Sequence, residues 1–224
     1  MLVEASMIKV VLWVLVAACV PALLVGFAGV LPESSSLAGS PAAFRDDLLE
    51  RTLLIVGDSA VTAVVEELVF RGLLLYGLVW AFRAIDRSAP SASAVFRAAV
   101  LQAVAFALAH VLGLDISLEA SSPVAALQFF AKFAQAFLFA VCMAYLLLKT
   151  ANLIFPILVH FAFNSVYFAP TVLMSGSFPE TYLTGSLFDL SIVLISAVIL
   201  GIPALRMLIE AKRGESLGLP RCVV

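Results

Sequence analysis

Six long apolar runs dominate this sequence and indicate a chain that folds inside a lipid bilayer. A helix needs about 20 predominantly apolar residues to cross the hydrocarbon core, which is about 30 Å thick. Runs of about this length occur at Ile8–Leu31, Leu53–Phe82, Val95–Leu112, Val124–Leu148, Leu153–Pro170 and Leu187–Leu205. We therefore predict an all-α fold, a polytopic transmembrane bundle of about six spans, in which residues 1–224 form a single transmembrane domain.

Composition supports this prediction and narrows the range of partners. Of the 224 residues, 63% are hydrophobic and 12% charged, whereas a soluble domain is about 45–50% apolar and about one quarter charged. The formal net charge is −2 and the sequence has no basic cluster, so we expect no nucleic-acid partner. Cys19, Cys142 and Cys222 do not have the spacing of metal ligands. Composition thus indicates the lipid bilayer as a partner and leaves the oligomeric state open.

The distribution of basic residues predicts the orientation of the spans, because cytoplasmic loops are enriched in lysine and arginine. Basic residues gather after the second, fourth and last predicted spans, at Arg83, Arg87, Arg97, Lys149, Arg206, Lys212, Arg213 and Arg221. Two alternate loops carry only the acidic residues Asp115, Glu119 and Glu180, and the first loop is mixed. We therefore predict a multi-pass protein of the plasma membrane with both termini in the cytoplasm.

A small set of ionisable and amide residues interrupts the apolar runs. A charged group at the bilayer centre costs at least about 2.5–3.5 kcal/mol on insertion scales, and such groups usually face the protein interior and serve a function. The set comprises Asp58, Glu66, Glu67, Arg71, Gln102, His110, Lys132, Gln135, His160 and Asn164. These residues are the first candidates for a functional site.

The two adjacent glutamates differ in their relation to Arg71. Neighbouring residues point about 100° apart on a helix, and Arg71 follows Glu67 by four residues, which is the favourable order for a helical ion pair. Glu66 is left to face another group, and a buried carboxylate without compensation is expensive. The alternative is that all three residues form a packing network.

Two histidines accompany the carboxylates. His160 and Asn164 are four residues apart and share a helix face, so they supply two hydrogen-bond donors of the kind that stabilises an oxyanion; an interhelical hydrogen-bonded pair is the alternative. His110 closes the segment Phe106-Ala-Leu-Ala-His110. Counting about 1.5 Å per residue places Glu66 and His110 at or beyond mid-membrane and His160 nearer the cytoplasm.

Three motifs in this order resemble those of a known family. Glu66-Glu67-Leu-Val-Phe-Arg71 matches EExxxR, Phe106 to His110 matches FxxxH, and His160-Phe-Ala-Phe-Asn164 matches HxxxN. Together they resemble the CPBP family, also called Abi, which contains CAAX prenyl endopeptidases and bacteriocin-processing or self-immunity membrane proteins. The resemblance covers a motif-bearing core at Val61–Phe168.

This resemblance implies a glutamate-dependent intramembrane endopeptidase without a cofactor. Glu66 would be the general base, and His110 would position or activate water. His160 and Asn164 would form the oxyanion hole, and the Glu67–Arg71 pair would support the geometry. The implied substrate is a peptide or prenylated-type protein at the membrane. The residue types fit this implied activity, because amide hydrolysis needs a general base, a group that orients it and donors to the oxyanion.

Three alternatives remain at this stage. The sequence has no H-E-x-x-H motif, which argues against a site-two-type zinc protease, yet two glutamates and two histidines could still bind zinc. A non-catalytic scaffold or immunity factor would bind a peptide partner without cleaving it. A small transporter would use a carboxylate–imidazole proton relay.

The predicted orientation is testable by cysteine labelling in sealed cells. Single cysteines at positions 90 and 220, in a background without the native cysteines, should be protected from a membrane-impermeant reagent and should react after lysis. Labelling of either position in intact cells would contradict the orientation.

Overall fold

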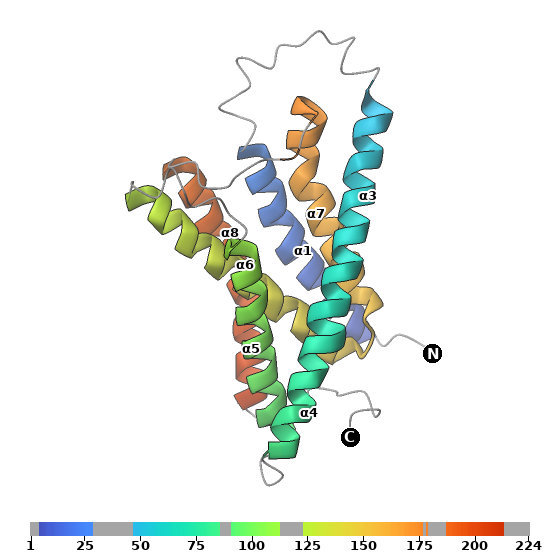
Figure 1. The fold of residues 1–224 in the computed structure, drawn as a ribbon, viewed down its shortest axis with the longest axis vertical. Helices are drawn as coiled ribbons and strands as arrows, with labels where there is room; N and C mark the ends of the chain where they lie inside the picture. The colour runs from blue at the N-terminus through green and yellow to red at the C-terminus, as the bar shows by residue number, and fades with distance from the viewer. Residues whose placement is uncertain are drawn as a thin grey trace.

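The structure of this chain is a computed structural model that describes residues 5–28, 47–85, 91–112, 123–176, 178 and 187–212. Within these residues all regular secondary structure is helical, which confirms the predicted all-α class (Figure 1). The elements are α1 (Ala5–Ala28), α3 (Leu48–Glu67), the π-helix η1 (Leu68–Leu75), α4 (Tyr76–Ile85), α5 (Ser91–Leu112), α6 (Pro123–Thr150), α7 (Ile154–Ser175) and α8 (Leu187–Lys212).

In the described part of the chain, four helices are long and apolar enough to cross a membrane. They cover Ser93–Leu112, Pro123–Thr150, Ile154–Met174 and Leu187–Met207, which correspond to the last four predicted spans. The first predicted span corresponds to α1 (Ala5–Ala28), in which the stretch Ile8–Leu24 is apolar. The second predicted span is a composite of α3, η1 and α4, and it falls outside this group because α3 alone carries five charged residues among its 20.

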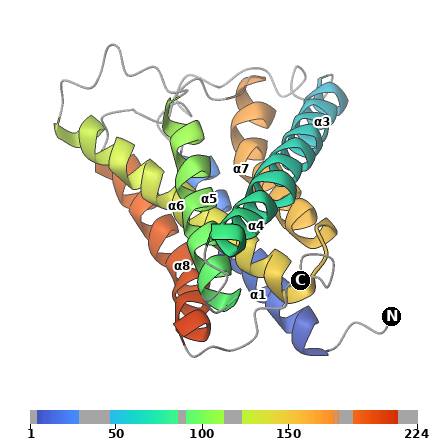
Figure 2. The ribbon, with the colours of Figure 1, turned by 60° about the horizontal axis from the view of Figure 1, so that its bottom comes forward.

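Helix α6 runs through the middle of the bundle and organises its core (Figure 2). Every residue from Phe139 to Leu148 is buried, and ten consecutive residues cover all sides of a helix, so this part of α6 is enclosed by protein. Its neighbours are α8, α5, α1 and α7. The sequence permits close packing because the α5 face toward this core is built from alanines, which let helix backbones approach one another. These are Ala94, Ala98, Ala99, Ala103 and Ala107, all buried.

The composite helix changes its winding directly after the paired glutamates. Residues Leu68–Leu75 form π-helical turns between α3 and α4, within the run Leu53–Phe82 that was predicted as a single span. The chain nevertheless continues without a break, because the Leu68 N–H still donates to the carbonyls of Val64 and Val65. π-helical segments are rare and are frequently found at functional sites, and this one contains Arg71.

A clamp joins the beginning of α3 to the end of α7. Arg51 Nη1 donates to the Leu173 carbonyl at 2.7 Å and to the Met174 carbonyl at 3.4 Å. Helix α7 then ends at Gly176, whose φ of +79° suits glycine and closes the last turn. The clamp holds α3 and α7 side by side, and these two helices carry both glutamates and the HxxxN motif.

Candidate active site

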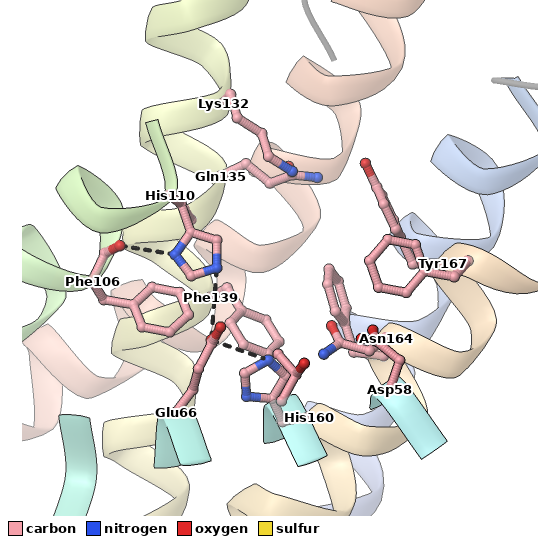
Figure 3. Close-up of a pocket in the computed structure, with 14 residues that line it drawn as sticks. Asp58, Glu66, Phe106, His110, Lys132, Gln135, Phe139, His160, Asn164 and Tyr167 are labelled. Carbon is pink, nitrogen blue, oxygen red and sulfur yellow. Dashed lines mark hydrogen bonds and ion pairs between the residues drawn. The ribbon is translucent and has the colours of Figure 1, made fainter. Parts of the chain in front are cut away.

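A cavity of about 200 Å³ lies between α3, α5, α6 and α7 (Figure 3). Of the six residues to which the family resemblance gives a role, four line it, namely Glu66, His110, His160 and Asn164. The remaining two, Glu67 and Arg71, are fully buried behind Glu66. Side chains from three separate motifs therefore meet around one space.

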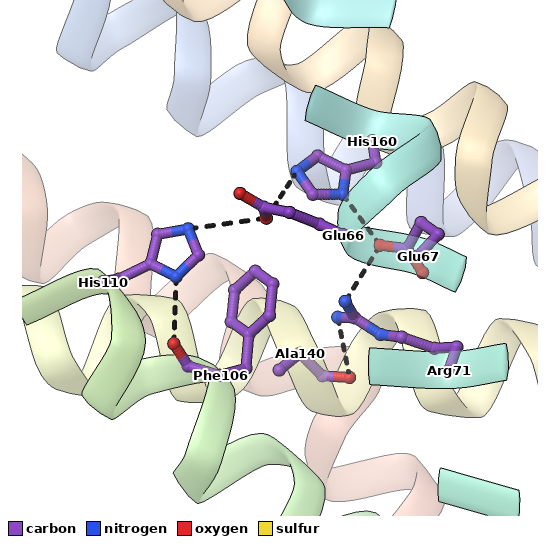
Figure 4. Close-up of polar contacts among 7 residues, drawn as sticks. All are labelled: Glu66, Glu67, Arg71, Phe106, His110, Ala140 and His160. Atoms are coloured by element: carbon purple, nitrogen blue, oxygen red, sulfur yellow. Dashed lines mark hydrogen bonds and ion pairs between the residues drawn. The ribbon is translucent and has the colours of Figure 1, made fainter. Parts of the chain in front are cut away.

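Glu66 occupies the centre of this arrangement. Its Oε2 atom is 3.7 Å from Nε2 of His110 and 3.7 Å from Nε2 of His160 (Figure 4). Both distances exceed the usual range of about 2.7–3.2 Å for a hydrogen bond from nitrogen to oxygen. The side chain of Glu66 keeps 24% exposure. Two imidazoles thus flank a carboxylate that can still be reached from the cavity.

The FxxxH spacing explains how His110 is oriented. Nδ1 of His110 is 2.9 Å from the carbonyl oxygen of Phe106, one helical turn earlier. A carbonyl can only accept, so Nδ1 must carry the proton in this contact. The imidazole also stacks on the Phe106 ring, with centroids 4.1 Å apart. In the neutral ring, Nε2 is therefore an acceptor that faces Glu66.

Glu67 has different surroundings from its neighbour. Its Oε1 atom is 2.9 Å from Arg71 Nη1 and 2.7 Å from Nδ1 of His160 (Figure 4). The Arg71 contact is an ion pair without hydrogen-bond alignment at Nη1. A carboxylate accepts, so Nδ1 of His160 donates here and its Nε2 is turned toward Glu66. One histidine thereby bridges the two adjacent glutamates.

Arg71 connects this cluster to the other two helices. Its guanidinium is fully buried, donates from Nη2 to the Ala140 carbonyl of α6 at 3.5 Å, and lies 4.6 Å from the centre of the Phe106 ring on α5. The cation over an aromatic face is a favourable contact in a desolvated site. Arg71 thus links η1, α5 and α6 directly beneath Glu66.

His160 reaches Glu66 despite the depth that residue counting suggested. The count placed His160 nearer the cytoplasm, whereas the structure brings its Nε2 atom close to the Glu66 carboxylate. Figure 1 shows the reason, since α4 continues well past the start of α7. The composite helix therefore extends beyond α7 at this end of the bundle. For that reason, the same number of residues counted from each helix end does not give the same depth in the membrane.

Three further members of the candidate set, Asp58, Lys132 and Gln135, line the cavity wall, although the sequence predicted no role for them. Lys132 Nζ donates to Gln135 Oε1 at 3.0 Å and lies 5.3 Å from the centre of the Tyr167 ring. The polar character of Lys132 and Gln135 was visible in the fourth run, and their i, i+3 spacing placed them on one face. Nothing in that spacing indicated that this face meets Glu66 across a shared space.

The cluster contains carboxylate and imidazole groups, which are of the kinds that bind metal ions. Among the described residues, no group of three or more His, Cys, Asp or Glu side chains is arranged to hold a metal ion. Metal independence stays a prediction, and it is tested below together with activity.

More than half of the chain matches a known protein family. Residues 48–166 match the family model described as type II CAAX prenyl endopeptidase Rce1-like. The match spans more than half of the chain and contains all six residues of the cluster. The chain belongs to this family. It is therefore an integral membrane protein among the CAAX-type intramembrane proteases of the CPBP group. No curated protein and no solved structure matches the chain.

The buried ion pair generates a prediction about stability. Glu67→Gln leaves Arg71 charged without its carboxylate, and breaking a buried pair in this way costs about 3–5 kcal/mol in soluble proteins. The glutamine oxygen can still accept from His160, so the loss should come from the charge. We expect low yield and a lowered unfolding temperature in detergent, measured by size-exclusion chromatography after heating.

The double variant Glu67→Gln/Arg71→Met is the matched control, because it removes both charges. It should recover more folded protein than Glu67→Gln alone. Equal stability of Glu67→Gln and the unmodified protein would show that the ion pair does not hold the site together.

Proposed function

We propose that this chain is a glutamic endopeptidase that hydrolyses a peptide bond at the membrane, with Glu66 as the general base. The observation that carries the proposal is the position of Glu66, whose Oε2 atom lies 3.7 Å from each of two imidazole Nε2 atoms at the wall of a cavity. Asn164 lines the same cavity and supplies an amide donor.

The first step is the activation of water. Neutral His110 presents an acceptor at Nε2, because its Nδ1 proton is directed to the Phe106 carbonyl. A water molecule between Glu66 and His110 donates one hydrogen bond to each acceptor, which directs an oxygen lone pair toward the substrate carbonyl. Glu66 takes the proton as the oxygen attacks the carbonyl carbon.

The second step is stabilisation and collapse of the tetrahedral intermediate. The Asn164 amide donates to the oxyanion. His160 can add a second donor only when doubly protonated, since its Nδ1 proton is committed to Glu67. The carbon–nitrogen bond then breaks, and the proton held by Glu66 passes to the leaving amine.

The cavity wall indicates the kind of substrate. The aromatic rings of Phe139, Phe163 and Phe168 line it beside the polar groups, so an apolar side chain can pack next to the scissile bond. The family description names prenylated CAAX sequences. We propose a peptide or prenylated-type protein substrate, bound at the membrane, and no resident cofactor.

We further propose that the protein lies in the plasma membrane with both termini in the cytoplasm. Helices α5 and α7 end, and α3 and α6 begin, at the same end of the bundle. The cavity lies between that end and the middle of the bundle. Among the described residues, Arg83, Lys149 and Arg206 lie toward the opposite end, near the ends of α4, α6 and α8. In this orientation the substrate reaches Glu66 from the non-cytoplasmic half of the membrane.

The decisive experiment compares variants of single carboxylate residues in proteoliposomes. Cleavage is measured with a fluorogenic peptide that carries a prenylated CAAX sequence. Glu66→Gln keeps the shape and removes the base, so it should fold and bind the peptide but lose cleavage. Glu50→Gln is the matched control, because Glu50 is a carboxylate on the same helix outside the cavity lining. Active Glu66→Gln would show that the wrong carboxylate was assigned.

The same assay separates the alternative functions. Cleavage should persist after strong chelation; stoichiometric zinc, with activity lost on removal and restored on return, would favour the zinc-dependent variant. Peptide that binds to the unmodified protein without cleavage would favour the non-catalytic scaffold or immunity factor.

The oxyanion donor makes a kinetic prediction. Asn164→Ala should lower kcat by about 10²–10³ with little change in KM, because the lost contact is made mainly in the transition state. Ser165→Ala, at the adjacent position outside the cavity lining, is the control. Unchanged kcat with weaker binding would assign Asn164 to substrate anchoring.

A further inference from the structure

An apolar groove lies between α1 and α8, which are neighbours in the bundle. Its volume is about 170 Å³, and it shares no lining residue with the candidate active site. The lining residues are Trp13, Val16, Ala17 and Val20 of α1 and Ile199 and Ile202 of α8. Neither helix carries a residue of the three motifs, so the proposed hydrolysis makes no use of this groove.

The groove has the character of a surface that meets lipid chains. Val16, Val20 and Ile202 are exposed, whereas the smaller Ala17 between them is buried, which leaves a furrow along the helix pair. Its volume lies below the range of about 300–1,000 Å³ that is usual for sites enclosing a whole small molecule. The furrow therefore suits a segment of one acyl chain and not a complete lipid.

Basic residues mark one end of this groove. On α1, Lys9 precedes Trp13 by four residues and so lies on the same helix face. On α8, Arg206 follows Ile202 by four residues, and its guanidinium carbon is 5.6 Å from the centre of the Trp13 ring. Lys9 is exposed, and the Arg206 side chain keeps 56% exposure. The groove-lining face of each helix thus leads to a basic side chain at the same end of the bundle.

A carboxylate on α8 holds Arg206 in this place. The Arg206 Nε atom donates to Glu210 Oε1 at 2.9 Å. Glu210 also accepts from the Tyr145 hydroxyl and pairs with Lys149 Nζ at 2.6 Å. Its side chain keeps only 10% exposure, so the arginine presents more of its surface to the membrane than the carboxylate does. A guanidinium has five N–H donors, and its contact through Nε is compatible with recognition of a second anion.

We propose that this groove and its two basic side chains bind an anionic phospholipid. One acyl chain lies along the furrow, and the phosphate lies between Lys9 and Arg206. Basic pockets between transmembrane helices recognise anionic headgroups, and arginine matches the geometry of phosphate oxygens. Trp13 completes the site, because tryptophan is enriched at the level of the headgroups. A lipid bound in this way would join α1 to α8.

The two tryptophans of the chain allow a site-specific test. Trp80→Phe leaves Trp13, in the groove, as the only tryptophan. Trp13→Phe leaves Trp80, which is 70% exposed on α4 and precedes Arg83 by three residues, so it reports ordinary contact of a basic helix end with lipid. Each variant is titrated in neutral detergent micelles with phosphatidylglycerol or phosphatidylcholine. Both lipids carry the same brominated acyl chains, which quench tryptophan fluorescence on contact.

Trp13 should reach half-maximal quenching at an about 5- to 30-fold lower mole fraction of phosphatidylglycerol than of phosphatidylcholine, as expected for one or two basic residues beside a phosphate. Trp80 should be quenched by both lipids at similar mole fractions. In the Trp80→Phe background, Lys9→Gln and Arg206→Gln should each reduce the preference and together remove it, with quenching by phosphatidylcholine unchanged. Lys9→Gln changes an exposed position, so it tests the site even where Arg206→Gln disturbs folding by releasing Glu210.

Four results would overturn the site. The same preference at both tryptophans would reduce it to general surface charge. Equal quenching of Trp13 by the two lipids would show that the groove takes acyl chains of any headgroup. Quenching by neither lipid would indicate another occupant, such as a second copy of this chain. A preference that survives in Lys9→Gln/Arg206→Gln would show that these side chains do not hold the phosphate.

Discussion

The candidate site depends on one buried interaction, the contact of Glu67 with both Arg71 and His160. Glu67 joins η1 to α7 through these partners, and Arg71 extends the connection to the Ala140 carbonyl on α6 and the Phe106 ring on α5. Four segments distant in sequence are thus held by a single carboxylate. Removing one partner of a buried charge pair leaves the other charge without compensation, so packings that separate Glu67 from Arg71 are disfavoured.

Because of this interaction, the two adjacent glutamates have different surroundings. Glu67 is fully buried and anchors one nitrogen of His160, while Glu66 keeps partial access to the cavity and faces the other nitrogen. The imidazole cannot rotate without losing its 2.7 Å contact. A buried residue without direct contact with the cavity thereby sets the surroundings of the residue that borders it. In the proposed mechanism, one carboxylate of the pair would position His160 while the other acts as the base.

Local features of this site could be predicted from the sequence, and its assembly could not. The spacing of Glu67 and Arg71 requires only helix geometry, and the apolar runs require only the thickness of a bilayer. The contact between His160 and Glu67 joins residues 93 positions apart, and no periodicity within one helix contains that information. The π-helical turns at Leu68–Leu75 were equally hidden, because the same residues fit a regular α-helix by propensity. Lys132 was recognisable as a costly residue, but its place opposite Glu66 depends on how α6 crosses α3.

The enclosed half of α6 has a consequence for the membrane as a barrier. A hydrolase embedded in an energised membrane must admit water and move a proton without opening a leak for ions. Here the described residues beside the cavity include ten consecutive buried positions of α6, from Phe139 to Leu148, packed against apolar side chains such as Val14 and Leu200. Cavities lined by such groups stay dry. If the proposed hydrolysis takes place in the cavity, this packed layer would separate the water and protons of the reaction from the other end of the bundle.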